Sequence, residues 1–145
     1  MNRESLKRLA VLLEGCRDSD VTRFDLQNWG KFEGRRAGFL WLEQRACNTA
    51  ACAVGLACGS GIFAEDGLSY KVDQINMELT PLFRDLEGWS AVKAFFDLDQ
   101  VQAVELFAGH SYEMTEGEVA ARAVAARIRK MIAPLNESVQ EVRER

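Results

Sequence analysis

Proline, histidine and long apolar runs are all scarce in this chain. With 2 Pro among 145 residues and a hydrophobic fraction of 48%, the composition is that of a globular domain and excludes a disordered or fibrous protein. No run approaches the roughly 20 apolar residues that a membrane span requires. The short apolar run from Leu9 to Leu13 is followed directly by Glu14, which does not suit a signal peptide. We therefore expect a cytoplasmic protein without a membrane segment, and we expect its 4 Cys to be reduced thiols.

Basic residues are also scarce in the middle of the chain. Residues 46–115 carry 3 basic and 10 acidic groups, a balance of −7, whereas the whole chain has a formal net charge of −4. A net acidic chain has no general attraction for phosphate backbones, so nucleic-acid binding is not expected. A solvated acidic surface is the simplest interpretation of this segment, and a contact surface for a basic partner is the alternative.

The spacing of apolar residues predicts a mainly α fold. Residues 1–134 are expected to form a single domain, a bundle of about five or six helices. Helices are predicted over 4–14, 48–58, 89–96, about 100–109 and 116–133, with a short helical turn over 62–66. Asn48 or Thr49 would cap the second helix and Asp99 the fourth, while Thr115 and Glu118 would form a capping box for the last.

Two segments lack the helical period. Residues 21–42 fit a small β-hairpin, with partial alternation around Phe24 and a turn between Gly30 and Gly34, although an irregular aromatic loop fits nearly as well. Residues 69–88 are predicted to be a structured loop with one short strand at most, because their apolar residues are scattered and Pro81 would break a helix.

A run of small residues forms a distinct motif, C-x-T-x-x-C-A-x-G-x-A, between Cys47 and Ala57. The motif and the glycine that follows it contribute five structural positions, Cys47, Thr49, Cys52, Gly55 and Gly59. A small residue at every fourth position, from 51 to 59, would let another helix approach closely. The chain resembles a group of small uncharacterised bacterial and prophage-type proteins that carry this motif between a Phe-Asp-aliphatic run (24–26) and a Gly-Trp pair (88–89). The resemblance covers about residues 24–132, departs from the group at Asn48 where a glycine is usual, and implies no established chemistry.

Three thiols and the single histidine are the main candidates for chemistry: Cys47, Cys52, Cys58 and His110. Four residues separate Cys47 from Cys52, within the usual C-x₂₋₄-C loop of a zinc site, and five separate Cys52 from Cys58. The intervening segment is predicted to be helical, so it does not form a loop that can wrap an ion. On one helix, Cys47 and Cys58 would lie about 16 Å apart along the axis, and Cys52 would point to another face. We therefore predict no catalytic residue, no cofactor and no metal, and we do not favour an enzyme. A metal or thiol-redox site formed by these four residues is the alternative.

Residues 135–145 form a predicted amphipathic tail. Leu135, Val139 and Val142 recur at helical spacing after Pro134. So short a helix is marginal alone, so it either docks on the domain or on a second chain, or frays. The sequence therefore favours a non-catalytic domain that binds an unknown protein partner or itself. The alternatives are the cysteine-based protein described above and an acidic mimic of nucleic acid of phage origin.

Overall fold

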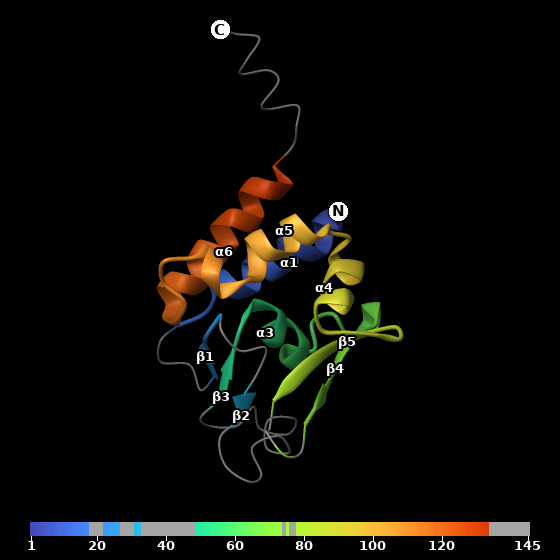
Figure 1. Ribbon diagram of the computed structural model, residues 1–145. Coiled ribbons are helices and arrows are strands. Elements are labelled where there is room, and N and C mark those ends of the chain that lie inside the picture. Colours follow the sequence, from blue (N-terminus) through green and yellow to red (C-terminus); the bar gives the residue numbers. More distant parts are fainter. Residues whose placement is uncertain (18–21, 27–30, 33–48, 74, 76–77, 134–145) are drawn as a thin grey trace, which may run out of the picture.

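The computed structural model describes residues 1–17, 22–26, 31–32, 49–73, 75 and 78–133. The described residues form five α-helices: α1 (Arg3–Glu14), α3 (Ala53–Ser60), α4 (Gly88–Phe96), α5 (Gln100–Phe107) and α6 (Gly117–Ile132). Two 3₁₀ turns, η1 (Ala64–Asp66) and η2 (Gly109–Ser111), lie between them. No helix in these ranges is long and apolar enough to cross a membrane. The fold is mainly helical, as predicted, but it is not a purely helical bundle, because the same ranges also contain two small sheets (Figure 1).

The first sheet contains β1 (Thr22–Phe24), β2 (Lys31–Phe32) and β3 (Thr49–Ala51) in the order β1-β3-β2. The predicted hairpin over 21–42 is therefore wrong: β1 and β2 do not pair with each other, because β3 lies between them. Strand β3 runs parallel to β1 and antiparallel to β2. A parallel pair needs a long crossover, so it joins segments that no local turn pattern relates.

The second sheet is antiparallel and contains β4 (Leu68–Val72), β5 (Leu79–Phe83) and β6 (Leu86–Glu87). It replaces the predicted loop over 69–88. Along β5, Leu79, Pro81 and Phe83 are buried and alternate with half-buried residues, which is the period of a strand. Pro81 pairs with Tyr70 of β4 but lies before the two residues that pair with β6. A proline is tolerated there because β5 has a free edge on that side.

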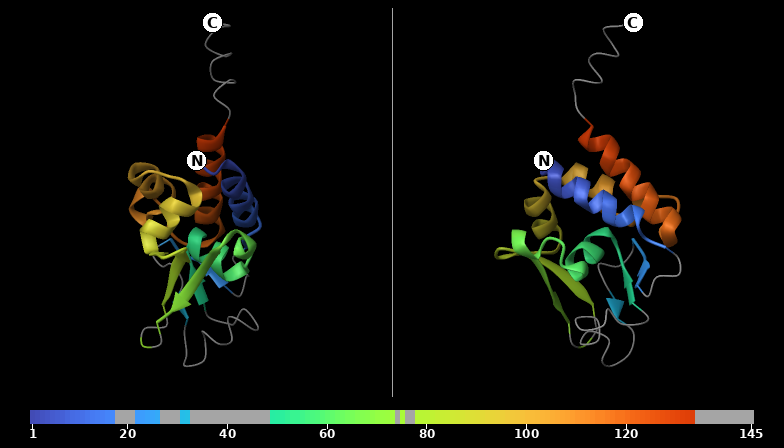
Figure 2. Two further views of the ribbon diagram at one scale, coloured as in Figure 1. Left: turned by 90° about the vertical axis from the view of Figure 1, so that its right-hand side faces the viewer. Right: turned by 180° about the vertical axis from the view of Figure 1, so that it is seen from behind.

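Helices α1 and α6 pack side by side and form one layer with α5, while the sheets lie at the opposite end of the molecule (Figures 1 and 2). On α1, Leu6, Leu9 and Leu13 are fully buried, which confirms the helix predicted over 4–14. The last predicted helix is also confirmed, but its capping box is not, because the side chain at the N-cap, Glu116, accepts no capping hydrogen bond. Residue 116 is instead bridged to the chain that follows β1, and the Thr115 carbonyl accepts the backbone N–H of residue 26.

Helix α3 begins later than predicted. Residues 49–51 are extended in β3, and the helix is capped by Cys52, whose sulfur accepts the N–H of Gly55 at 3.5 Å. The predicted caps Asn48 and Thr49 are therefore wrong: Thr49 lies in a strand and Asn48 lies outside the described residues. Gly59 does not end the helix, because the left-handed residue that follows α3 is Gly61, with φ +77°. The late start of the helix has a clear cause, the recruitment of residues 49–51 into a sheet.

Aromatic rings join the helices to the second sheet. Phe63 packs against Phe95 and Phe96 of α4, with ring centroids 5.1 and 5.9 Å apart, and Phe95 also meets Phe83 of β5. Such tilted and edge-to-face pairs stabilise a core beyond the area they bury. The next helix, α5, begins as predicted at Asp99, which forms a capping box with residue 102.

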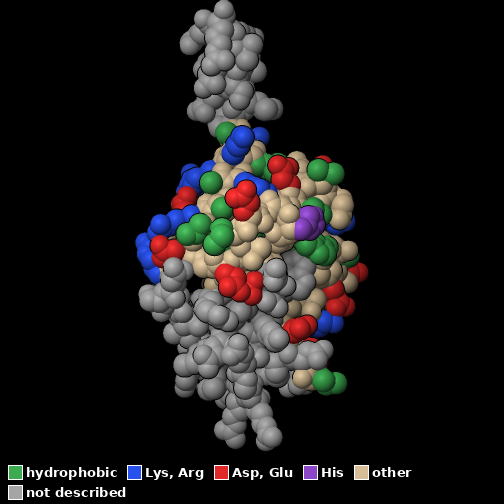
Figure 3. Space-filling view, turned by 60° about the vertical axis from the view of Figure 1, so that its left-hand side comes forward, with side chains coloured by type: hydrophobic (Ala, Val, Ile, Leu, Met, Phe, Trp, Pro, Cys, Tyr) green, Lys and Arg blue, Asp and Glu red, His purple; other side chains and the backbone are tan. Residues whose placement is uncertain are grey.

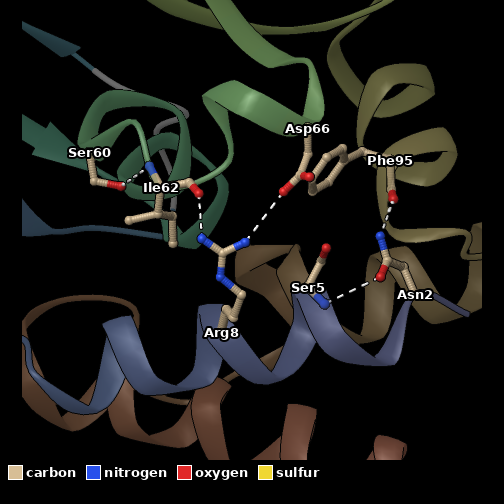
Figure 4. A network of polar contacts seen from close by, with 7 residues as sticks. All are labelled: Asn2, Ser5, Arg8, Ser60, Ile62, Asp66 and Phe95. Carbon is tan, nitrogen blue, oxygen red and sulfur yellow. Dashed lines mark hydrogen bonds and ion pairs between the residues drawn. The ribbon is translucent and has the colours of Figure 1, made fainter.

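Polar contacts fix α1 against its neighbours (Figure 4). The guanidinium of Arg8 donates to the Ile62 carbonyl at 2.6 Å and to the Asp66 carboxylate at 3.3 Å. At the start of the helix, the side-chain amide of Asn2 donates to the Phe95 carbonyl at 3.1 Å. These bonds join α1 to η1 and to α4, so the polar groups on this side of the molecule hold the chain together.

Candidate functional site

The predicted thiol cluster is only partly described. Cys52 and Cys58 are buried at the two ends of α3, His110 is exposed in η2, and Cys47 lies outside the described residues. Within the part of the chain that the structure describes, no three His, Cys, Asp or Glu side chains are grouped closely enough to hold a metal ion. Cys52 and Gly55 of the sequence motif serve instead to start α3.

Burial makes both described thiols of α3 poor nucleophiles. It raises the pKa of Cys52 to about 11, although three backbone hydrogen bonds act in the opposite direction. Burial also raises the pKa of Cys58, and the nearby Cys52 raises it further. Since the thiolate is the form that attacks electrophiles and binds metals, both sulfurs stay protonated and unreactive at neutral pH. Their surroundings suit packing and helix capping.

A groove of about 690 Å³ opens on the described part of the surface. Four parts of the fold meet there: the residue after β1, the cap of α3, the start of α4, and the continuous segment from α5 to Thr115. The residues that line it are Leu26, Cys52, Trp89, Gln100, Val104, Phe107, Ala108, Gly109, His110, Tyr112 and Thr115. Figure 3 shows the single histidine of the chain at the surface, beside hydrophobic side chains. The groove therefore brings together Cys52 and His110 of the predicted set, but not Cys58.

The floor of the groove is apolar and its rim is polar. Leu26, Cys52 and Phe107 form the floor, and each is at most 5% exposed. Trp89 and Tyr112 are half-buried in the walls, and the exposed polar side chains stand at the rim. An apolar hollow with a few polar groups at its edge is the usual form of a binding site in a protein.

Hydrogen bonds to the last turn of α5 hold the wall of the groove in place. The Ser111 hydroxyl donates to the Val104 carbonyl at 3.0 Å, and the Tyr112 hydroxyl donates to the Leu106 carbonyl at 2.7 Å. The guanidinium of Arg127 donates to the Glu105 carbonyl at 2.9 Å. The Glu105 and Leu106 carbonyls, which the end of the helix leaves open, are thus satisfied by side chains. The Val104 carbonyl, which already accepts the Ala108 N–H at 3.0 Å, accepts a second hydrogen bond.

Arg127 ties this wall together from α6. Its second nitrogen donates to the Ser111 carbonyl at 2.5 Å, and its guanidinium carbon lies 3.8 Å from the centre of the Tyr112 ring. Burial raises the pKa of Tyr112 to about 12, although the adjacent arginine acts in the opposite direction. The phenol is therefore neutral and donates its hydrogen bond throughout the physiological range.

Sequence patterns alone did not point to the groove. Its lining comes from positions between 26 and 115, so no local spacing relates them. One signal was present: α5 carries more apolar residues than its buried face contains. Ala103, Leu106 and Phe107 are buried, while Val101 is 73% exposed and Val104 is half-buried. A short helix with more apolar surface than the core can cover indicates a contact surface.

Comparisons with protein-family models, with curated proteins and with solved structures gave no match. The resemblance to bacterial prophage-type proteins and the cytoplasmic location therefore stay predictions. The three apolar residues of the predicted tail, Leu135, Val139 and Val142, lie outside the described residues.

Proposed function

We propose that this chain is a non-catalytic protein-interaction domain, and that a partner protein inserts an apolar side chain into the groove beside α5. The observation that carries the proposal is the groove itself, with a buried floor and aromatic walls. Protein interfaces concentrate their binding energy in a few anchors that fill such hollows, and Trp and Tyr are enriched among the residues that form them. Trp89 and Tyr112 occupy these positions here.

The surface next to the groove also supports contact with a protein. Val101 is 73% exposed and lies one helical turn before Val104 and Glu105, so it extends the apolar lining outward. A groove of about 690 Å³ is large enough for a small organic ligand, but an exposed valine beyond its edge offers that ligand nothing. A partner protein would cover both surfaces.

The fixed wall lowers the entropic cost of binding. Because Ser111, Tyr112 and Arg127 already hold the last turn of α5, little of the groove has to become ordered when a partner arrives. Preorganisation of this kind increases affinity without any new contact.

The partner protein can also be a second copy of this chain. The predicted tail, residues 135–145, would then dock on that copy. Deletion of residues 135–145 is then expected to lower the mass measured by sedimentation.

A matched pair of surface variants tests the proposal. Random short peptides displayed on phage are selected on the full chain, and each enriched peptide is titrated by fluorescence anisotropy. Val101→Gln combined with Val104→Gln removes the apolar edge of the groove and is expected to weaken binding at least about tenfold. The control is Val11→Gln on α1, since Val11 is 57% exposed and does not line the groove. Binding that is equal for all three proteins, or no enrichment, would contradict the proposal.

A further inference from the structure

Three acidic residues are sequence neighbours of residues that line the groove. Glu105 follows Val104 in α5, and Glu113 and Glu116 each follow a lining residue in the segment after η2. All three are exposed, and none forms an ion pair with another described residue. Figure 3 shows acidic side chains on the same face as the histidine. The edge of the groove therefore carries negative charge that the described part of the chain does not neutralise.

One of these carboxylates acts on a residue that lines the groove. Burial is the main cause of the raised pKa of Tyr112; Arg127 acts in the opposite direction, and the charge of Glu105 adds to the increase. A ligand that enters beside Tyr112 would therefore experience the negative charge of Glu105. The backbone carbonyl of Glu105 is held by Arg127.

Two described cations contact residues that line the groove. Arg127 donates to two carbonyls and stacks on Tyr112, and Lys93 donates to the side-chain oxygen of Gln100 at 3.0 Å. Both keep their positive charge, and neither is paired with Glu105, Glu113 or Glu116. Because the three carboxylates outnumber these two cations, the balance of these five charges is negative and attracts positive charge.

We infer that the partner segment carries lysine or arginine beside its apolar anchor, an inference that rests on the proposed function. The buried floor selects an apolar side chain, and the acidic rim selects its neighbours. Complementary charge at a rim steers association and excludes partners of the wrong sign, so an acidic segment or a nucleic-acid backbone is disfavoured. The site would thus recognise a short basic segment of a protein with one large apolar residue.

The experiment uses three peptide libraries with one shared apolar position. Its neighbours are Lys or Arg in the first library, Ser or Gln in the second, and Asp or Glu in the third. Each library is selected on the full chain. Enriched peptides are then titrated against the wild type, against Glu105→Lys with Glu113→Lys, and against a control, Glu65→Lys with Glu78→Lys. The control residues are exposed glutamates without an ion pair among the described residues, and they do not line the groove.

The inference expects enrichment of the basic library. It also expects binding to fall at least about tenfold on charge reversal at the rim, to change little in the control, and to weaken from about 50 to about 500 mM NaCl. Equal enrichment of the neutral library, with loss of binding in Val101→Gln/Val104→Gln, would overturn the inference and leave the proposed function standing. Basic peptides that are insensitive to that double variant would bind elsewhere and overturn the proposed function. So would the failure of all three libraries.

Discussion

The charged residues of α1 and those around the groove differ in what they contact. On α1, Arg8 bonds to η1, and Glu14 accepts two bonds from Arg129 of α6 at 2.6 and 2.7 Å. Beside the groove, Glu105 and Glu113 have no cationic partner among the described residues. Charges of the first kind contribute to the fold, whereas charges of the second kind are available to another molecule. The difference supports the proposed contact surface on the α5 side, and it can be tested by removing charges from each side.

The largest effect is expected from Arg127, which builds the wall of the groove. Arg127→Ala removes charge-assisted hydrogen bonds to the Glu105 and Ser111 carbonyls and the stacking on Tyr112. Because bonds of this type are worth about 1.5–3 kcal/mol, the free energy of unfolding in urea should fall by about 2 kcal/mol. Hydrogen exchange of the amides in 109–112 should accelerate at the same time.

The control for this loss is another arginine of the same helix. Arg122 lies 3.6 Å from Glu118 in an exposed pair, so Arg122→Ala should cost less than about 0.5 kcal/mol. Equal losses in the two variants would mean that Arg127 contributes only a surface charge. The wall of the groove would then be loose, and binding of a partner would have to order it.

A smaller effect that depends on pH is expected from Glu14. The hydrogen bond from Arg129 lowers the pKa of Glu14 in the folded chain. A lowered pKa stabilises the fold above the pKa of the unfolded carboxyl, and this contribution is lost as the pH falls through the folded value. Glu14→Gln should therefore be less stable than the wild type at neutral pH, and the difference in urea midpoint should vanish in acid.

Salt and a matched glutamine test the same pair. The pair is about two-fifths exposed, so added salt should reduce the difference at neutral pH. Glu65→Gln, which removes an exposed glutamate without an ion pair among the described residues, should leave the urea midpoint unchanged. A difference that persists below the pKa of the carboxyl would show that lost packing, and not the ion pair, explains the variant.

How far the sequence predicted the fold depended on whether a signal was local. The helices α1 and α6 were predicted because apolar residues such as Leu6, Leu9 and Leu13 repeat within a few positions. The first sheet was missed because β1 pairs with β3, more than twenty residues further along the chain. In β5 the apolar residues alternate as in a strand, but Pro81 led us to predict a loop there. A proline excludes a helix, but a strand tolerates it where no neighbouring strand needs its N–H.

Competition between local and distant partners explains the other differences. The sequence offered Thr115 as a helix cap, but its carbonyl and its neighbour are engaged with the chain after β1. The groove depends on the same contact between the chain after β1 and residues 115–116, because this contact places Leu26 beside the segment that carries Tyr112. The acidic middle of the chain was visible in the sequence, with a solvated surface as the simplest interpretation and a surface for a basic partner as the alternative. Which acids lie beside a hollow could follow only from the fold.

The smallest change in stability is expected from Glu105 and Glu113, the carboxylates for which we propose contact with a partner. Glu105→Gln combined with Glu113→Gln should leave the free energy of unfolding within about 0.5 kcal/mol of the wild type, because neither carboxylate has an ionic partner among the described residues. The same variant should lower the pKa of Tyr112, which the charge of Glu105 raises, and an ultraviolet titration measures this directly. A loss above about 1 kcal/mol would mean that these carboxylates hold the fold together, as Glu14 does. Unchanged stability with a lowered phenol pKa would mean that Glu105 acts on the groove without supporting it, which is the property expected of a residue that contacts a partner.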